Sequence, residues 1–329
     1  SFTRILEQCR LKGFKVDEEP LIPAAITVPP PPPPPAEESP TGFGYAFPVW
    51  QDTQGIPDIE LHRPAVSTLR NLSTVVSEGE RIASVSVVPE ALARRSLSMD
   101  DGLATIAIQS ILNLLGTASN RVPLATTEGL LDCVLLHCHS PVAKLQRLAV
   151  LCLPMMCFPQ SIQPSLARHG ALVDTLIYLM QLRNPELQKA GSVALWHLSA
   201  AYQNHELLCS LPGVLEVLAP LLLPRRFDGD LPALFKQVEP NELVLGALSC
   251  ICNFAVEGSN RLRIVKKHST LEAIVKLLDH PSHEIRDLAR RTLMMLFETT
   301  ADQTESVTPY LESLRGVLKA KNICKFYNY

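Results

Sequence analysis

The most apolar stretches of this chain recur at a nearly constant spacing, and each has the length and composition of a helix. Marking every stretch at one equivalent position gives spacings of 42, 42, 45, 53 and 42 residues. Self-similarity at this period is the signature of a solenoid, in which each helical unit packs only against its neighbours. The pattern predicts stacked helical units rather than a compact enzyme with one pocket. The marked positions are Asn71, Asn113, Met155, Ala200, Asn253 and Met295.

The presumed starts of the second helix in each unit provide an independent measure of the period. These starts are separated by 41, 41, 43 and 56 residues, and in three units an Asn lies nine residues before the start, at positions 120, 204 and 260. Both measures place extra residues in the fourth unit, where the segment 224–240 combines Pro, Gly and mixed charge. We interpret that segment as a surface insert between two helices. The starts are Val88, Gly129, Gly170, Gly213 and Ser269.

These stretches resemble the armadillo repeat family, whose units carry an Asn-Arg start, a Gly-Ala-Leu opening of the second helix and a third helix of the form A-x-x-x-L-x-N-L-A. The segment Ser259 to Phe297 follows the whole pattern, and the resemblance extends over about 64–317. It implies an all-α, right-handed armadillo/HEAT-like α-solenoid of about five to six units, with the third helices lining one long face. Met155 and Met295 replace the Asn, and Pro154 lies inside a third helix, where we expect a kink or an early end.

The residues before and after this repeat domain have a different character. Residues 1–19 are expected to contain a short amphipathic helix over Phe2 to Leu11, and residues 318–329 form a C-terminal tail. Residues 20–63 form a proline-rich extended arm, in which the unbroken run Pro29–Pro35 must adopt the polyproline II conformation. We interpret the run as a stiff linker, with a ligand for an aromatic-lined groove of another protein as the alternative.

Three groups of apolar residues outside the repeats are candidate partner contacts. The first lies on the N-terminal helix, and the second is an aromatic cluster dense enough to pin the arm to a surface. The third lies in the insert, where apolar side chains are rimmed by arginines and aspartates. The candidates are Phe2, Ile5 and Leu6 in the helix, Phe43, Tyr45, Phe47 and Trp50 in the arm, and Phe227, Leu231 and Phe235 in the insert.

Composition supports the helical interpretation and excludes several functions. Hydrophobic residues make up 47% of the chain but aromatics only 5%, which predicts an aliphatic core. A net charge of −3 provides no electrostatic case for binding nucleic acid or an anionic membrane. The longest apolar run, 148–159, is shorter than the roughly 20 residues of a transmembrane helix. Nine cysteines on apolar helix faces indicate buried, reduced thiols and a reducing compartment such as the cytosol or the mitochondrial matrix.

No catalytic constellation emerges, and we predict no catalytic, cofactor-binding or metal-binding residue. Glycine-rich nucleotide motifs are absent from the sequence. One cluster has metal-ligand residue types, Cys133, His137, Cys138 and His139, but only the first two share a helix face and no second ligand pair follows. We interpret this cluster as a buried helix end.

Importin-α-like members of the family bind basic peptides with W-x-x-x-N on successive third helices. Here the Trp and the Asn never coincide, since Trp196 is followed four residues later by Ala200 and the residues four before the asparagines are not Trp. Nuclear-import-type recognition is therefore not expected. The residues four before Asn71, Asn113 and Asn253 are Ser67, Gln109 and Ser249.

We therefore expect a non-enzymatic structural scaffold, a subunit of a large multiprotein assembly whose partners are other protein subunits. The alternative is a free armadillo adaptor, cytoplasmic or ciliary, that binds peptide partners in its groove and recruits a proline-recognition partner through its proline-rich segment. The armadillo core, the N-terminal arm and a chain starting at Ser1 without Met also resemble the armadillo-type peripheral-stalk subunit associated with the mitochondrial ATP synthase of chlorophycean algae. That resemblance implies a mitochondrial location and a mechanical role, bracing the stator and bridging the enzyme dimer.

Overall fold

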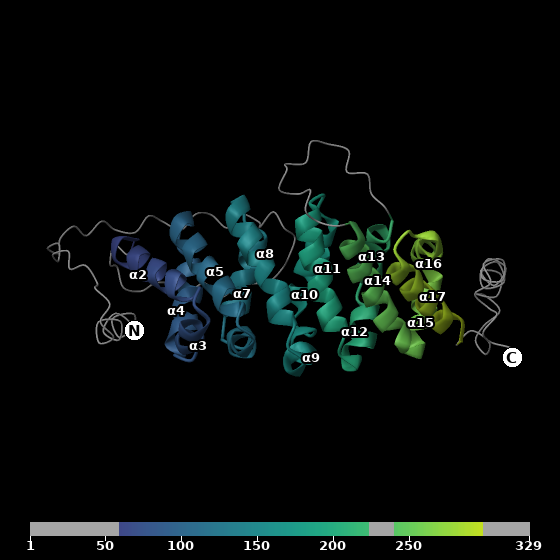
Figure 1. Cartoon of the computed structure of the whole chain (residues 1–329), viewed down its shortest axis with the longest axis horizontal. Helices are drawn as coiled ribbons and strands as arrows, with labels where there is room; N and C mark the ends of the chain where they lie inside the picture. The colour runs from purple at the N-terminus through teal and green to yellow at the C-terminus, as the bar shows by residue number, and fades with distance from the viewer. Residues whose placement is uncertain (1–58, 224–239, 299–329) are drawn as a thin grey trace, which may run out of the picture.

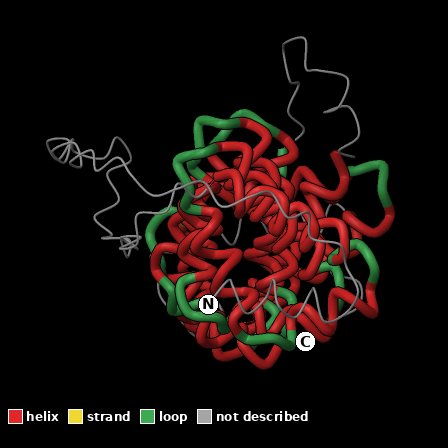
Figure 2. The backbone as a smooth tube through the Cα atoms, turned by 90° about the vertical axis from the view of Figure 1, so that its left-hand side faces the viewer, coloured by secondary structure: helices red, strands yellow, loops and turns green. Residues whose placement is uncertain are grey.

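The computed structural model of the chain describes residues 59–223 and 240–298, and these contain helices, turns and loops but no strand. The helices stand side by side in an elongated row, with the N-terminal helices at one end and the C-terminal helices at the other (Figure 1). Seen from its end in Figure 2, the described part has a round outline, with the loops at the rim. The described helices pack within their own unit or against the adjacent unit, as a solenoid requires.

One layer of the solenoid consists of the third helices, each of which packs along the next. A second layer contains the second helices, which also follow one another. The third helices are α2 (Ile59–Leu72), α5 (Asp101–Leu115), α8 (Ala143–Cys157), α11 (Pro185–Ser199), α14 (Pro240–Val256) and α17 (His283–Glu298). The second helices are α4 (Val87–Ser96), α7 (Leu130–Cys138), α10 (Gly170–Gln181), α13 (Val214–Leu221) and α16 (His268–Lys276) with η5 (Leu277–Asp279).

Short first helices connect the two layers. In the described residues α2 is followed by five complete units, which confirms the predicted five to six. The first helices are α3 (Val76–Ala83), η1 with α6 (Ala118–Asn120, Arg121–Ala125), η2 with α9 (Gln160–Ile162, Gln163–Leu166), η3 with α12 (Tyr202–Asn204, His205–Ser210) and α15 (Gly258–Lys266).

The core is a single apolar cluster that runs from α2 to α17. It is built largely of Leu, Ile, Val and Ala, and Phe254 is its largest fully buried side chain, so the aliphatic core expected from composition is present. All seven described cysteines are buried and unpaired, as their positions on apolar helix faces predicted. Burial raises the pKa of Cys133 to about 11 and that of Cys157 to about 12, which keeps both thiols protonated.

The asparagines that mark the repeat are structural hydrogen-bond donors. The last carbonyl groups of a helix have no partner within that helix and must find one elsewhere. Nδ2 of Asn120 donates to the carbonyl of Leu114 at 3.0 Å, and each of the other two asparagines donates to the carbonyl six residues before it. Gln163 does the same in the third unit, through Nε2 to Cys157 at 3.2 Å. All four amides are at most 4% exposed. The remaining pairs are Asn204 with Leu198 and Asn260 with Phe254.

The residue after each of the three asparagines caps a further carbonyl of the same third helix. Arg121 Nε donates to Leu115 at 3.0 Å and Arg261 Nε donates to Ala255 at 2.7 Å, which accounts for the Asn-Arg pair. In the fourth unit the position is held by His205, whose Nε2 lies 2.9 Å from the carbonyl of Ser199. The ring is 5% exposed, and burial lowers its pKa.

The buried histidines predict that stability falls in mild acid. A group whose pKa is lower in the folded state binds a proton less readily there than when unfolded, so stability is lost as pH falls below the unfolded value of about 6.5. Burial lowers the pKa of His137, His139, His197 and His205. We expect the melting temperature to fall between about pH 7.5 and about pH 5.5. His205→Arg retains a donor to Ser199, so it should reduce the fall, whereas an unchanged slope would contradict the assignment.

The repeat register of α11, the fourth helix in the series of third helices, differs from the prediction. The helices α5, α8 and α11 each contain 15 residues, and their last nine positions alternate between buried and accessible in the same order. The thirteenth residues are Asn113, Met155 and His197, so His197 and not Ala200 holds the equivalent position. The error arose because Ala194 was matched to the small residue of the pattern, a place that Gly191 occupies. The spacings become 42, 42, 42, 56 and 42, which leaves one 14-residue insertion.

Several predicted boundaries also shift. The early end expected at Pro154 does not occur, because α8 continues through it to Cys157 with Leu153 and Met156 fully buried on either side. The helix α2 begins at Ile59 and contains Pro64, and Pro240 is the first residue of α14 rather than the end of the insert.

Gly129 and Gly213 precede second helices with φ of 71° and 91°, a conformation that explains the glycines at these starts.

In the described residues no single helix has the length and apolar character to cross a membrane. Two bent pairs, α5 with residues 118–125 and α8 with residues 160–166, pass that test together, with bends of 112° and 89°.

Candidate partner-binding face

The exposed sides of the third helices form one continuous surface, which we call the third-helix face. At the N-terminal ends of these helices, ion pairs join one helix to the next. Arg147 Nε of α8 lies 2.6 Å from Glu186 Oε1 of α11, and Lys189 of α11 pairs with Glu242 of α14. Exposed pairs of this kind contribute about 0–1 kcal/mol each. Their main consequence is that these charges are already matched within the solenoid.

The asparagines of the third helices are also engaged inside the solenoid. Asn113 Nδ2 donates to the carbonyl of Arg70 at 3.2 Å and to Ser73 Oγ at 3.1 Å, and its Oδ1 accepts from Gln109 Nε2 at 2.9 Å. Asn253 Nδ2 donates to Ser199 Oγ at 3.0 Å. These amides therefore link successive third helices, and a bound peptide backbone would have to compete with those hydrogen bonds.

At the C-terminal ends of α8 and α11 the third-helix face carries an aromatic patch, which we define as Phe158, Trp196, His197 and Arg121. Phe158 follows the last residue of α8 and is 53% exposed, and Trp196 in the last turn of α11 is 41% exposed. The His197 ring lies 5.1 Å from Phe158, edge to face, and 5.5 Å from Trp196, nearly parallel. Arg121 Cζ lies 5.0 Å from the centre of the Phe158 ring, a cation–π contact.

The patch is apolar with a single positive group. Burial, and then the positive charge of Arg121, lower the pKa of His197, so its imidazole is neutral at pH 7. Arg121 is held in place by its hydrogen bond to Leu115 while its guanidinium covers one side of Phe158. Exposed rings next to an anchored cation are typical of a protein interface, where aromatic residues and Arg are enriched.

A second aromatic contact follows in the next unit. Tyr202 is 60% exposed, its hydroxyl donates to Glu257 Oε2 at 2.6 Å, and its ring lies 5.3 Å from that of His205. This hydrogen bond raises the pKa of Tyr202 and lowers the pKa of Glu257. Exposed rings thus extend from the end of α8 past the end of α11.

No family model matches this chain, and no curated protein sequence matches it significantly. A designed armadillo repeat protein superimposes with a TM-score of 0.58 at 16% identity, over 74% of this chain and 96% of that chain. Computationally designed armadillo repeat proteins for modular peptide recognition give a TM-score of 0.60 at 18% identity, over 73% of this chain and 94% of that chain. The fold is an armadillo solenoid.

A natural system supports the same conclusion. A chain from a study of the phosphorylation switch that controls the interaction between cadherin and beta-catenin superimposes with a TM-score of 0.58 at 17% identity. The match covers 76% of this chain and 45% of that chain. The predicted armadillo/HEAT-like fold class is confirmed.

The cluster with metal-ligand residue types does not converge in the armadillo structure. His137 Nε2 lies 2.7 Å from the carbonyl of Ser96, whereas the His139 ring lies 4.4 Å from Tyr178. Cys133 and Cys138 are buried in the core. In the described parts of the chain no three His, Cys, Asp or Glu side chains are placed to hold a metal ion together.

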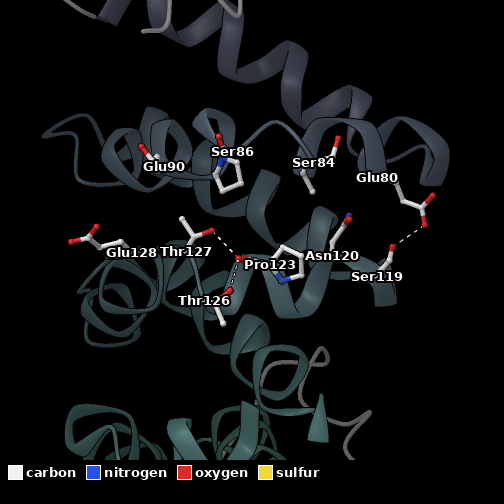
Figure 3. Close-up of a pocket in the computed structure, with 12 residues that line it drawn as sticks. Glu80, Ser84, Ser86, Glu90, Ser119, Asn120, Pro123, Thr126, Thr127 and Glu128 are labelled. Carbon is white, nitrogen blue, oxygen red and sulfur yellow. Dashed lines mark hydrogen bonds between the residues drawn. The ribbon is translucent and has the colours of Figure 1, made fainter. Parts of the chain in front are cut away.

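A surface hollow of about 730 Å³ lies between the first two armadillo units (Figure 3). It is lined by Glu80, Glu90 and Glu128 together with serine and threonine hydroxyls. Ser119 Oγ donates to Glu80 at 2.8 Å, and Thr127 Oγ1 donates to the carbonyl of Pro123 at 2.8 Å. The lining contains no His, Cys, Lys or Arg.

The partner contacts proposed from sequence lie outside the described residues. Those in the N-terminal helix and arm fall within 1–58, and those in the insert fall within 224–239. Sequence reasoning considered Trp196 only as a failed W-x-x-x-N motif and did not consider Phe158. A usable signal was present, because aligning the third helices by their equal lengths places Trp196 at an accessible position of α11 and Phe158 directly after the end of α8.

Proposed function

We propose that this chain is a non-enzymatic scaffold that binds partner proteins through its third-helix face, with the aromatic patch as the main contact. The observation that carries the proposal is the exposure of Trp196 and Phe158 on a solenoid whose other large side chains are mostly in the core. Exposing such rings to water is unfavourable, and Trp is the residue type most enriched among those that dominate binding energy.

The face favours a short local contact over an extended peptide bound residue by residue. Reading a long peptide requires matching residues on successive third helices, and this series is interrupted at Met155, His197 and Met295. The asparagines at 113 and 253 already donate within the solenoid. A designed armadillo protein with a TM-score of 0.57 was solved with the peptide (KR)4. In this chain the acidic Glu186 and Glu242 are instead paired with its own basic residues.

The proposal predicts that the double variant Trp196→Ala, Phe158→Ala keeps its fold and loses its partners. Loss of the two interface aromatics should reduce the binding free energy by at least about 2 kcal/mol in total, which lowers partner recovery at least roughly 30-fold. The measurement is purification of tagged full-length chain from its native source, with quantitative mass spectrometry. The matched control is Met99→Ala with Val76→Ala, which removes exposed apolar side chains elsewhere (100% and 65% exposed). Equal recovery from all three proteins would refute this role for the patch.

More specifically, we propose that the chain is a permanent subunit of a large assembly, and the peripheral stalk of a mitochondrial ATP synthase is the most specific candidate. Support comes from the solenoid, which suits a rigid spacer, and from the resemblance noted above, with the arm and the insert as further contacts. Native gel electrophoresis of membrane extracts tests it, because co-migration with the synthase dimer and mitochondrial localisation are expected. Migration outside the synthase, as a small complex with only a proline-recognition partner, would favour the free adaptor.

Deletion of 224–239 should weaken assembly without unfolding the chain.

A further inference from the structure

Two features of this protein complement each other chemically. The sequence contains seven consecutive prolines, Pro29–Pro35, and the third-helix face carries exposed aromatic rings. Of the nine large apolar side chains that are exposed in the described residues, the three aromatic ones lie close in sequence to the ends of α8 and α11. We infer that the aromatic patch binds the chain's own proline run, so that the N-terminal arm folds back over the third-helix face.

Aromatic rings and a polar donor are the usual partners of polyproline. Proline rings pack flat against the faces of Trp, Tyr and Phe, and the polyproline II helix leaves its carbonyl oxygens unpaired and ready to accept hydrogen bonds. The indole N–H of Trp196 makes no hydrogen bond to any residue that the structure describes, so it is available as a donor. The neighbouring His197 is neutral and adds a flat ring 5.5 Å away. An uncharged ligand suits this surface.

The tether is long enough for the run to reach the patch. The arm joins the solenoid at Ile59, the start of α2, and α11 is separated from α2 by three steps along the row of third helices. Packed helices lie about 8–10 Å apart, so three such steps and the length of one helix place Trp196 within roughly 40 Å of Ile59. The 23 residues from 36 to 58 can span up to about 75 Å when extended. A tether of this kind gives an effective concentration of about 1 mM, so even a weak site is occupied within one molecule.

Binding of the arm would block the proposed partner site, and it would occur in the isolated chain with no partner present. A docked arm covers Phe158 and Trp196, so a partner that uses the same rings must displace it. The arm would then keep the patch covered until assembly and be released when the partner binds. The inference concerns the same patch as the proposed function but can be tested on the isolated full-length chain.

Tryptophan fluorescence provides the test because the chain has only two Trp residues, Trp50 and Trp196. In a Trp50→Phe background, the emission reports on Trp196 alone. Replacing Pro29–Pro35 by seven Gly and Ser residues should shift this emission to longer wavelength. Acrylamide quenching should increase about twofold, since the ring loses its cover and meets water. A peptide of residues 26–38 added to this variant should reverse both changes.

The control replaces residues 16–22 by Gly and Ser, which alters the arm to the same extent but keeps the proline run. Equal quenching in the background, the control and the proline-replaced chain would overturn the inference. So would protection of Trp196 that depends on protein concentration, because a second copy would then cover the patch. If Trp196 is protected by the run but the patch variants retain their partners, the inference holds and the proposed partner site is wrong.

Discussion

Replacing Leu248 by Asp will unfold the C-terminal part of the solenoid. Leu248 is 0% exposed in α14, which packs between α11 and α17. An aspartate there would be an unpaired charge in an aliphatic core, at a cost of more than about 4 kcal/mol. Because solenoid units are stabilised mainly by their neighbours, we expect the fourth and fifth units to lose structure while the first three remain folded.

Circular dichroism and hydrogen exchange would measure this loss. We expect a reduced helical signal, a melting transition that separates into two steps, and exchange protection limited to the N-terminal units. Ser249→Asp is the matched control, since it places the same charge one residue further on, at an accessible position of the third-helix face. If both variants melt alike, the helical register described for α14 is wrong. Leu293→Asp, also at a 0% exposed position, should affect mainly the last unit.

Replacing Asn204 by Leu should destabilise the junction between the third and fourth units. The side chain of Asn204 donates to the carbonyl of Leu198 at 2.8 Å and to that of Gln163 at 3.1 Å, and it is 0% exposed. Leu is similar in size but leaves the carbonyl of Leu198 unpaired in the core and removes one of the two hydrogen bonds to Gln163, whose carbonyl still accepts from the Ala167 N–H. An unpaired buried group costs about 1–3 kcal/mol. The melting temperature should fall by roughly 4–12 °C for a domain of this size.

Two controls separate the hydrogen bonds from the general effect of the substitution. Asn71→Leu changes an exposed asparagine and should leave the melting temperature nearly unchanged. Asn204→Gln should be tolerated better than Asn204→Leu, since Gln163 makes the equivalent hydrogen bond in the third unit. Equal losses for the Leu and Gln variants would show that packing, rather than carbonyl capping, determines this position.

The sequence by itself determined the features of this protein that depend on local periodicity. The recurrence of aliphatic stretches identified the third helices, and Asn120, Asn204 and Asn260 marked the unit starts, because these buried amides cap carbonyls at the ends of α5, α11 and α14. The glycines at 129 and 213 marked two starts of second helices, since the backbone there needs a positive φ. The fold class and the place of the insertion followed from these local requirements.

Only the tertiary structure decided which residues face outward together. His197 rather than Ala200 continues the series of third-helix positions, because the register depends on burial against two neighbouring helices and not on the identity of one small residue. Gln163 substitutes for Asn because a longer side chain can reach the same carbonyl. Arg121 and Phe158 belong to the second unit, at the start of α6 and directly after α8, whereas Trp196 and His197 belong to the third, and they meet because neighbouring units stack side by side. Contacts between units depend on that stacking, and the linear pattern does not show which rings from different units meet.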